Sequence, residues 1–506
     1  MTSTETQSDK KLFLACFVAL STTSFGFILR ALTLPQWGSE FNLTNTQIGE
    51  IAGVGLWPFA ISIVLFSLII DRVGYKNAMI FAFLCHTVSA ALTVFASGYW
   101  SLYIATFIMA LGNGTIEAVV NPVVTTLFPK EKTKWLNILH AAWPVGLVVA
   151  GIMALVLGED ASWKIKMILI LIPTLSYGLM MFARKFPVNE RVKAGVSYLE
   201  MLKEVGVGGI SVVTALVVFQ IGSIFGWPTI VNLGITVLIV AGFGAYVKSF
   251  GQPIFILLIL LMIPLATTEL GTDSWISDLM APEMKSIGLQ AGWILVYTSA
   301  IMALLRMFAG PIIHKISALG LLATCSAIAC VGLLLLSVSS GAMILVAATL
   351  FALGKTFFWP TMLGVVAERF PKGGALTLNI TGGVGMIAAG VIGAVILGFV
   401  QDKQIDSKLT SYDQEHTTSL HESYATDRKY SIFGDYQSVN AALLATGPAE
   451  DQQVVKGIQE TAKKEALKTV AIFPVIMLAT YIFLLIYFKA RGGYKVVMLD
   501  EKTAAS

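Results

Sequence analysis

The chain has 506 residues, of which 56% are hydrophobic and only 13% are charged. Soluble domains carry about 25% charged residues, so this composition excludes a soluble globular protein. The net charge is only +4, and the basic residues lie in short clusters between apolar runs. This pattern excludes nucleic-acid binding, which needs a concentrated basic surface.

A helix that crosses a bilayer needs about 20 mostly apolar residues. The first part of the chain holds six such runs, near residues 12–34, 46–70, 77–97, 101–128, 135–157 and 164–183. We therefore predict a six-helix N-terminal half at residues 1–183.

A basic segment at 183–206 follows, which we interpret either as a helix on the cytoplasmic surface or as a solvated linker. Two more apolar runs come next, near 207–225 and 228–247. Residues 184–250 are therefore predicted to form a cytoplasmic linker segment plus two extra transmembrane helices.

The C-terminal half, predicted at 251–506, again holds six apolar runs, near 253–279, 287–312, 317–338, 342–367, 374–400 and 469–488. A polar insert at 401–468 separates the last two and is predicted to lie outside, with an amphipathic helix within 451–468. The sequence thus predicts an all-α membrane protein with fourteen spans, arranged as six, two and six.

The two halves share three short words in the same order, always 242 residues apart (110 to 352). The words are ALG at 110–112 and 352–354, FPK at 128–130 and 370–372, and LNI at 136–138 and 378–380. Duplicated bundles place a substrate path between their halves, near the bilayer midplane. The repeat therefore predicts a transporter.

Lysine and arginine concentrate in alternate loops, for example at Arg72, Lys130, Arg184 and Lys315, and in both terminal segments. Short loops rich in these residues stay in the cytoplasm. We expect both termini in the cytoplasm, in a multi-pass protein of the inner or plasma membrane.

Ionisable residues occur inside several predicted spans. At mid-bilayer each costs about 2.5–3.5 kcal/mol and is usually paired or lines a wet cavity. We expect Arg30 to pair with Glu117. Glu269 and Asp273, one helical turn apart, should reach Lys355 or an Arg306 that we place nearer the cytoplasmic surface. Such pairs can couple transport to protons; static buried salt bridges are the alternative.

Polar and aromatic residues near these charges suggest what is bound. Asn113, Asn121 and Asn379 offer amides for hydroxyl groups, and Trp143 and Trp359 offer flat faces for sugar rings. The alternatives are amides that bridge helices and aromatics at the membrane interface. His140 can relay protons.

Prolines and cysteines complete the set of candidate features. Pro122 and Pro360 each leave a backbone carbonyl free for a ligand or water. The four cysteines lack the paired spacing of metal or redox sites, so we expect no metal and no cofactor.

The segment SLIIDRVGYK (67–76) resembles the G-x-x-x-D-R-x-G-R-[KR] loop of the major facilitator superfamily. Asp71, Arg72, Gly74 and Lys76 are in register, whereas Ser67 replaces the first glycine of the pattern and Tyr75 replaces its arginine. The resemblance implies a major facilitator bundle in which these four residues form a cytoplasmic gate.

Residues 112–146 resemble the fucose–galactose–glucose proton symporters, which carry G-x-G-x-x-E-x-x-x-N-P on the fourth helix and L-N-x-x-[QH] on the fifth. The matching positions are Gly112, Gly114, Glu117, Asn121, Pro122, Leu136, Asn137 and His140. The resemblance implies that Glu117 couples protons to substrate and that Asn121 contacts sugar. The first helix departs from it, with Arg30 where that group carries an aspartate.

We therefore expect proton-coupled import of a sugar or related polyhydroxylated solute by alternating access, in a monomer whose partners are its substrate, protons and lipid. Sodium coupling, export of amphiphilic compounds and transport of another small polar metabolite stay open. A transporter-shaped receptor or scaffold is the alternative of a different class. We expect no enzyme.

Overall fold

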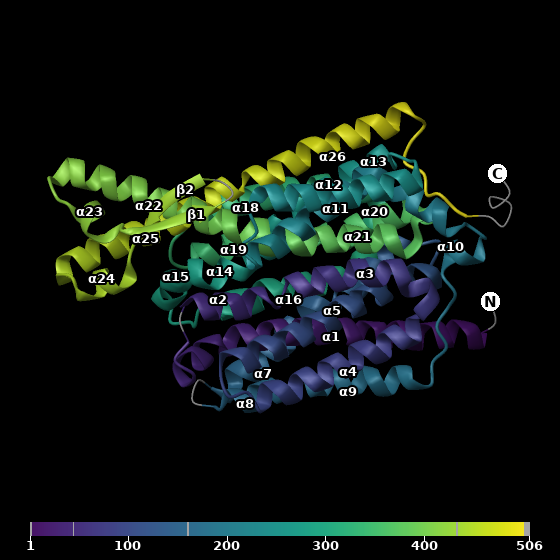
Figure 1. The fold of residues 1–506 in the computed structure, drawn as a ribbon, viewed down its shortest axis with the longest axis horizontal. Helices are drawn as coiled ribbons and strands as arrows, with labels where there is room; N and C mark the ends of the chain where they lie inside the picture. Colours follow the sequence, from purple (N-terminus) through teal and green to yellow (C-terminus); the bar gives the residue numbers. More distant parts are fainter. Residues whose placement is uncertain (1–2, 44, 159–160, 432–433, 500–506) are drawn as a thin grey trace.

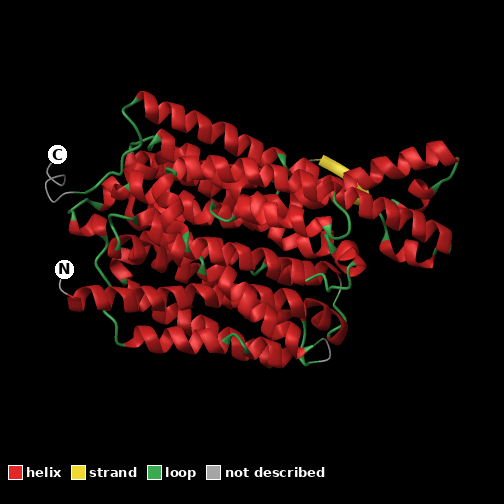
Figure 2. Ribbon diagram, turned by 180° about the vertical axis from the view of Figure 1, so that it is seen from behind, coloured by secondary structure: helices red, strands yellow, loops and turns green. Residues whose placement is uncertain are grey.

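The computed structural model describes residues 3–43, 45–158, 161–431 and 434–499. Long helices run side by side along one axis (Figure 1), and the described strands form a single antiparallel hairpin (Figure 2). Apolar runs become helices because only a helix satisfies every backbone polar group within its own segment in lipid.

The helices of the N-terminal half pack mainly on one another, with α1 against α7 and α5 against both α3 and α4. They are α1 (Ser3–Glu40), α2 (Asn45–Gly53), α3 (Trp57–Val73), α4 (Tyr75–Val94), α5 (Tyr99–Leu127), α6 (Lys132–His140), α7 (Ala142–Leu157), α8 (Trp163–Ile168) and α9 (Leu171–Phe182).

A short linker and two further helices follow. They are α10 (Glu190–Lys193), α11 (Tyr198–Ile224) and α12 (Thr229–Val247). Helix α11 begins earlier than the expected span near 207–225, and it kinks at Gly206, whose φ of 58° is left-handed. Helix α11 thus has a first part within the basic segment at 183–206 and, after the kink, a second part that forms the expected apolar span. Helix α12 buries only Asn232 and Val247 among its described residues.

The C-terminal half includes two π-helical turns and one 3₁₀ turn. Its elements are α13 (Pro253–Ala266), η1 (Thr267–Gly271), α14 (Thr272–Leu279), α15 (Ala281–Ser286), α16 (Trp293–Met307), α17 (Ala309–Lys315), α18 (Ala318–Val338), α19 (Met343–Lys355), α20 (Phe358–Arg369), η2 (Pro371–Gly373), α21 (Gly374–Ile387), η3 (Ala388–Gly393) and, after the insert, α26 (Ile472–Ala490).

The insert is an ordered subdomain at the end of the bundle opposite to the start of α1 and the end of α26 (Figure 1). It contains α22 (Ala394–His416), α23 (Leu420–Tyr424), β1 (Asp427–Ser431), β2 (Gly434–Ser438), α24 (Ala441–Thr446) and α25 (Ala449–Val470). The amphipathic helix expected within 451–468 is part of α25. The subdomain has its own apolar cluster, which includes Leu409, Leu420 and Val455.

Twelve helices in the described ranges are long and apolar enough to cross a membrane, or thirteen if the bent pair α16 and α17 is one span. The expected count of fourteen is therefore not confirmed. The run near 374–400 is not among them, because α21 gives way to η3 and then to the polar α22, and the side chains at 391–398 lie outside the described set.

The two halves meet along α3 with α21, α7 with α16, and α6 with α20. The main apolar core is continuous across this interface. The interface contains the candidate site.

Candidate functional site

A cavity of about 20 Å³ lies between the halves, which is room for about one water molecule. Both halves line it. The lining residues are Phe59, Glu117, His140 and Trp143 from the N-terminal half, and Glu269, Leu270, Arg306, Trp359 and Met386 from the C-terminal half. Six of the residues selected from the sequence thus share one cavity: Glu117, His140, Trp143, Glu269, Arg306 and Trp359.

Glu117 belongs to a hydrogen-bonded chain within the N-terminal half. The Asn121 amide nitrogen donates to Glu117 Oε2 at 2.7 Å, and Asn121 Oδ1 lies 2.9 Å from His140 Nε2. Because Oδ1 can only accept, His140 Nε2 carries the hydrogen of this bond. Glu117 and Asn121 lie one helical turn apart on α5, as their spacing in the sequence pattern requires. His140 is the last residue of α6.

Arg306 is the centre of a second cluster and is only 1% exposed. It donates to Glu269 Oε1 at 2.7 Å, to the His140 carbonyl at 3.0 Å and to the Thr356 carbonyl at 2.5 Å. Our expectation that Arg306 lies near the cytoplasmic surface is therefore wrong. Its bond to the His140 carbonyl joins the Glu117 chain to Glu269 across the interface.

Prolines explain both carbonyl contacts of Arg306. A proline cannot donate to the carbonyl four residues before it. Pro144 thus frees the carbonyl of His140, and Pro360 frees that of Thr356. We expected the carbonyl freed by Pro360 to serve a ligand or water, whereas in the structure it accepts from the protein's own arginine.

Glu269 lies on the π-helical turn η1, five residues after Pro264 of α13. Single π-helical turns are frequent at functional sites. The Trp359 amide donates to Glu269 Oε2 at 3.3 Å, which holds the second carboxylate oxygen. One turn further along, Asp273 pairs with Lys355. Glu269 and Asp273 therefore have separate cations.

Arg30 does not pair with Glu117, contrary to expectation. Its guanidinium lies 6.0 Å from the Phe27 ring centre and against Gly55, where an added Cβ would overlap it. Arg30 is 7% exposed, and in the described part of the chain no carboxylate binds it. Gly55 lies four residues before Phe59, and Phe27 packs on Trp143, so both neighbours of Arg30 adjoin the cavity lining.

Three expected contact residues lie outside the cavity lining: Asn121, whose bonds to Glu117 and His140 are given above, and Asn113 and Asn379. Asn113 bonds to His86 Nε2 at 2.9 Å, and His86 Nδ1 lies 3.1 Å from the Tyr177 hydroxyl, all within the N-terminal half. Asn379 donates to the Ala118 carbonyl at 3.1 Å. Asn113 Oδ1 and Asn379 Nδ2 are thus occupied by the protein, whereas Asn379 Oδ1 is buried and has no hydrogen-bond partner among the described residues.

The expected gate residues lie where α3 ends and α4 begins, and Gly74 between the two helices has a left-handed φ of 80°. Asp71 pairs with Arg191 of α10, not with Arg72. Arg72 and Lys76 are exposed. The sequence pattern correctly indicated that Asp71 forms a contact, but the partner is Arg191 of the linker.

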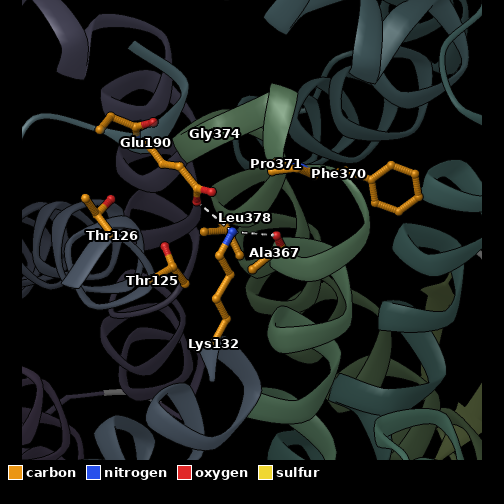
Figure 3. Close-up of a pocket in the computed structure, with 10 residues that line it drawn as sticks. Thr125, Thr126, Lys132, Glu190, Ala367, Phe370, Pro371, Gly374 and Leu378 are labelled. Atoms are coloured by element: carbon orange, nitrogen blue, oxygen red, sulfur yellow. Dashed lines mark hydrogen bonds and ion pairs between the residues drawn. The ribbon is translucent and has the colours of Figure 1, made fainter. Parts of the chain in front are cut away.

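The linker also closes the interface at this end. Lys132 Nζ donates to Glu190 Oε2 at 2.6 Å and to the Ala367 carbonyl at 3.3 Å (Figure 3). One residue further, Thr133 Oγ1 bonds to Glu368 Oε1 at 2.5 Å. The linker residues Glu190 and Arg191 were not selected from the sequence, because a short charged loop carries no signal of its partners.

Comparison with known proteins supplies the family. The sequence profile described as Major Facilitator Superfamily matches residues 12–281. The gentisate transporter of Corynebacterium glutamicum is 31% identical over 159 residues, which are 31% of this chain and 36% of that protein. The L-fucose-proton symporter of Escherichia coli is 29% identical over 126 residues, which are 24% of this chain and 29% of that protein. The chain thus matches about a third of the length of these curated relatives.

The fold is also similar to a solved structure of the proton:xylose symporter. The TM-score is 0.63 at 11% identity, and the superposition covers 99% of both chains. With a profile match over more than half its length, the chain belongs to the major facilitator superfamily of multi-pass membrane proteins.

Proposed function

We propose that the chain is a proton-coupled secondary transporter of a small metabolite that carries a carboxylate, moved by alternating access through the central cavity. The observation that carries this proposal is Arg30, a buried cation beside the cavity that no carboxylate of the described residues contacts. A buried charge needs a partner, and a substrate anion can supply one.

The charges around the cavity favour coupled movement of an anion and a proton. Arg306 and Lys355 are neutralised by Glu269 and Asp273. The remaining charges are Arg30 and Glu117, which do not bind each other. When Glu117 takes up a proton, the site has one unbalanced positive charge. An anion then restores neutrality, so substrate and proton are favoured together.

The names of three relatives support a substrate that carries a carboxylate. One is called a gentisate transporter, one a cis,cis-muconate transport protein and one a hexuronate transporter. Each of the substrates in these names is an acid that is ionised at neutral pH. The matches cover about a third of those proteins, so they support a substrate class and not an individual compound.

A neutral sugar is the second candidate, favoured by the Glu117, Asn121 and His140 chain, which resembles the fucose-type pattern. Asn121 already bonds to both neighbours, so a sugar would have to displace one of these bonds. A sugar acid would use Arg30 and the amide together.

The remaining assignments are part of the same proposal. Both termini are cytoplasmic, residues 1–183 and 251–506 rock as halves, and the linker contacts of Asp71 and Lys132 close the cytoplasmic side. The cavity has room for about one water molecule, which is the size expected of an occluded conformation.

The test is a thermal-shift screen of the purified protein against aromatic acids, sugar acids and neutral sugars, because a ligand of the folded state raises Tm. Acids should stabilise the wild type, and Arg30→Gln should remove the effect. Gly55→Ala should displace the Arg30 guanidinium. Binding of the acid should then weaken about tenfold or more, because the charge-assisted hydrogen bond from Arg30 to its carboxylate is lost. Gly53→Ala is the matched control, because a Cβ there meets nothing within 4 Å.

Two results would overturn the assignment. Stabilisation by neutral sugars that persists in Arg30→Gln would favour the sugar candidate. Uptake into proteoliposomes that requires a sodium gradient and does not respond to a proton gradient would identify sodium, and not the proton, as the coupling ion.

A further inference from the structure

A basic cavity of about 500 Å³ lies away from the central site, at the end of the bundle where α1 begins and α26 ends. It is formed where α20 and α26 finish and α13 begins, beside the first turns of α11 (Figure 1). Its lining includes three cations, Arg369, Lys372 and Arg491.

None of these three cations makes an ion pair among the described residues. Arg369 lies 4.9 Å from the Phe488 ring centre and donates to the Lys495 carbonyl at 2.6 Å. Its Nε atom is buried and lacks a hydrogen-bond partner. Arg491 lies 4.4 Å from the Tyr487 ring centre. Aromatic rings thus orient both guanidinium groups without neutralising them.

The opposing charge in the cavity is small. Glu204 is the one carboxylate among the lining residues, and Gln252 Nε2 donates to it at 3.4 Å. Three cations against one carboxylate leave an excess of positive charge in a cavity large enough for a phosphate group and its ester oxygens.

Apolar residues form the rest of the wall. Ile254, Phe370 and Val497 line the cavity beside the cations. The neighbouring helices are apolar on their outer sides: Phe483 and Ile486 of α26 are exposed, as is most of α12. A ligand with an anionic head and apolar chains fits this combination, because basic pockets between helices at the cytoplasmic surface bind anionic lipid headgroups.

We propose that this cavity is a binding site for the headgroup of an anionic phospholipid, held by Arg369, Lys372 and Arg491. The site is separate from the central cavity and shares none of its lining residues. The lipid would tie α20 and α26 of the C-terminal half to α11, the first of the two additional helices.

Native mass spectrometry of the full-length protein tests the site, with phosphatidylglycerol or phosphatidylcholine added to the detergent solution. The wild type should bind phosphatidylglycerol more tightly. Lys372→Gln with Arg491→Gln should weaken that binding roughly 25-fold, at about fivefold for each cation removed. Arg369 is left intact because it also holds the chain near Lys495.

The matched control is Lys248→Gln with Lys489→Gln, which removes two exposed cations at the same end of the bundle but outside the cavity. This control should keep wild-type affinity within about twofold. Equal weakening in control and test variants would overturn the site, as would equal binding of the two lipids by the wild type.

A free phosphate is distinguished in a separate arm. Inorganic phosphate is titrated against the lipid-free protein with Tm as the readout. No stabilisation by millimolar phosphate is expected, because the apolar wall of the cavity adds binding energy only for a ligand that has acyl chains. Stabilisation that equals that of phosphatidylglycerol and disappears in the Lys372→Gln, Arg491→Gln variant would assign the cavity to soluble phosphate and overturn the lipid.

Discussion

Asn379 donates its side-chain amide at 3.1 Å to the main-chain oxygen of Ala118, across the interface between the halves. Pro122, four residues after Ala118, removes the helical donor of that oxygen. Asn137, the counterpart of Asn379 in the internal repeat, donates to Thr361 Oγ1 at 3.2 Å in the reverse direction. Asn137 and Asn379 thus each donate a hydrogen bond that joins their own half to the other half.

Replacing both asparagines should favour opening at this end of the bundle. Each buried hydrogen bond contributes about 1 kcal/mol, so Asn137→Leu with Asn379→Leu should raise the open population by roughly tenfold or more. Alkylation of a cysteine introduced at Ala367, a 6% exposed side chain at the same interface, would report the change. Asn77→Leu, on an exposed face of α4, is the control, and equal alkylation in all three proteins would contradict the fastening role.

Glu117→Gln should abolish accumulation against a gradient while substrate exchange continues. Glutamine keeps the hydrogen bond to Asn121 but cannot release a proton. Proteoliposome uptake driven by a pH gradient, compared with counterflow, measures the two activities separately. Accumulation at the wild-type level in this variant would exclude Glu117 as the coupling group.

Arg306→Met should destabilise the protein strongly, because it leaves Glu269 charged and buried without its partner. Breaking one side of a buried pair costs about 3–5 kcal/mol. Thermal unfolding in detergent should therefore show a clearly lower Tm, and Arg306→Met with Glu269→Leu should recover part of the loss. A double variant less stable than Arg306→Met alone would mean that the carbonyl contacts of Arg306 dominate.

The contact between the insert and the bundle should weaken in acid. Lys464 of α25 pairs with Glu283 of α15, and the hydrogen bond from Lys464 lowers the pKa of Glu283 below its ordinary 4.5. A carboxyl with a lowered folded pKa stabilises above its ordinary pKa, and this contribution is lost as the pH falls through the folded pKa.

The protection factors of residues 281–286 and 449–470 against hydrogen exchange, which correct for the intrinsic pH dependence of amide exchange, should therefore fall below about pH 4.5 and change little between pH 6 and 8. Lys464→Gln should remove the acid-dependent step. The Lys408 and Glu465 pair, which lies within the insert, serves as an internal reference. Identical acid profiles for Lys464→Gln and the wild type would exclude this pair as the sensor.

The sequence was most informative where a residue type is costly in lipid. Glu117, Glu269 and Lys355 were found because a charge in an apolar run needs a partner, and the structure gives partners to each of them. The internal repeat indicated the interface, and its LNI word contains both Asn137 and Asn379. These features depend on composition and spacing, which a sequence contains directly.

Partners across the interface were harder to predict. Arg30 was matched to Glu117 by opposite charge, but it turns toward Gly55, where the missing side chain leaves room. Arg306 was placed too near the surface because the bend between α16 and α17 was not visible. Pro144 and Pro360 were the available signal, since each frees a carbonyl that a buried arginine can use.

The link between the Glu117 chain and Glu269 passes through the main-chain oxygen of His140. Side-chain substitution at His140 cannot delete this atom. Replacement of the imidazole would therefore remove the hydrogen bond to Asn121 but leave the bond from Arg306 that joins the two halves. A residue with an amide hydrogen in place of Pro144 would compete for the same oxygen.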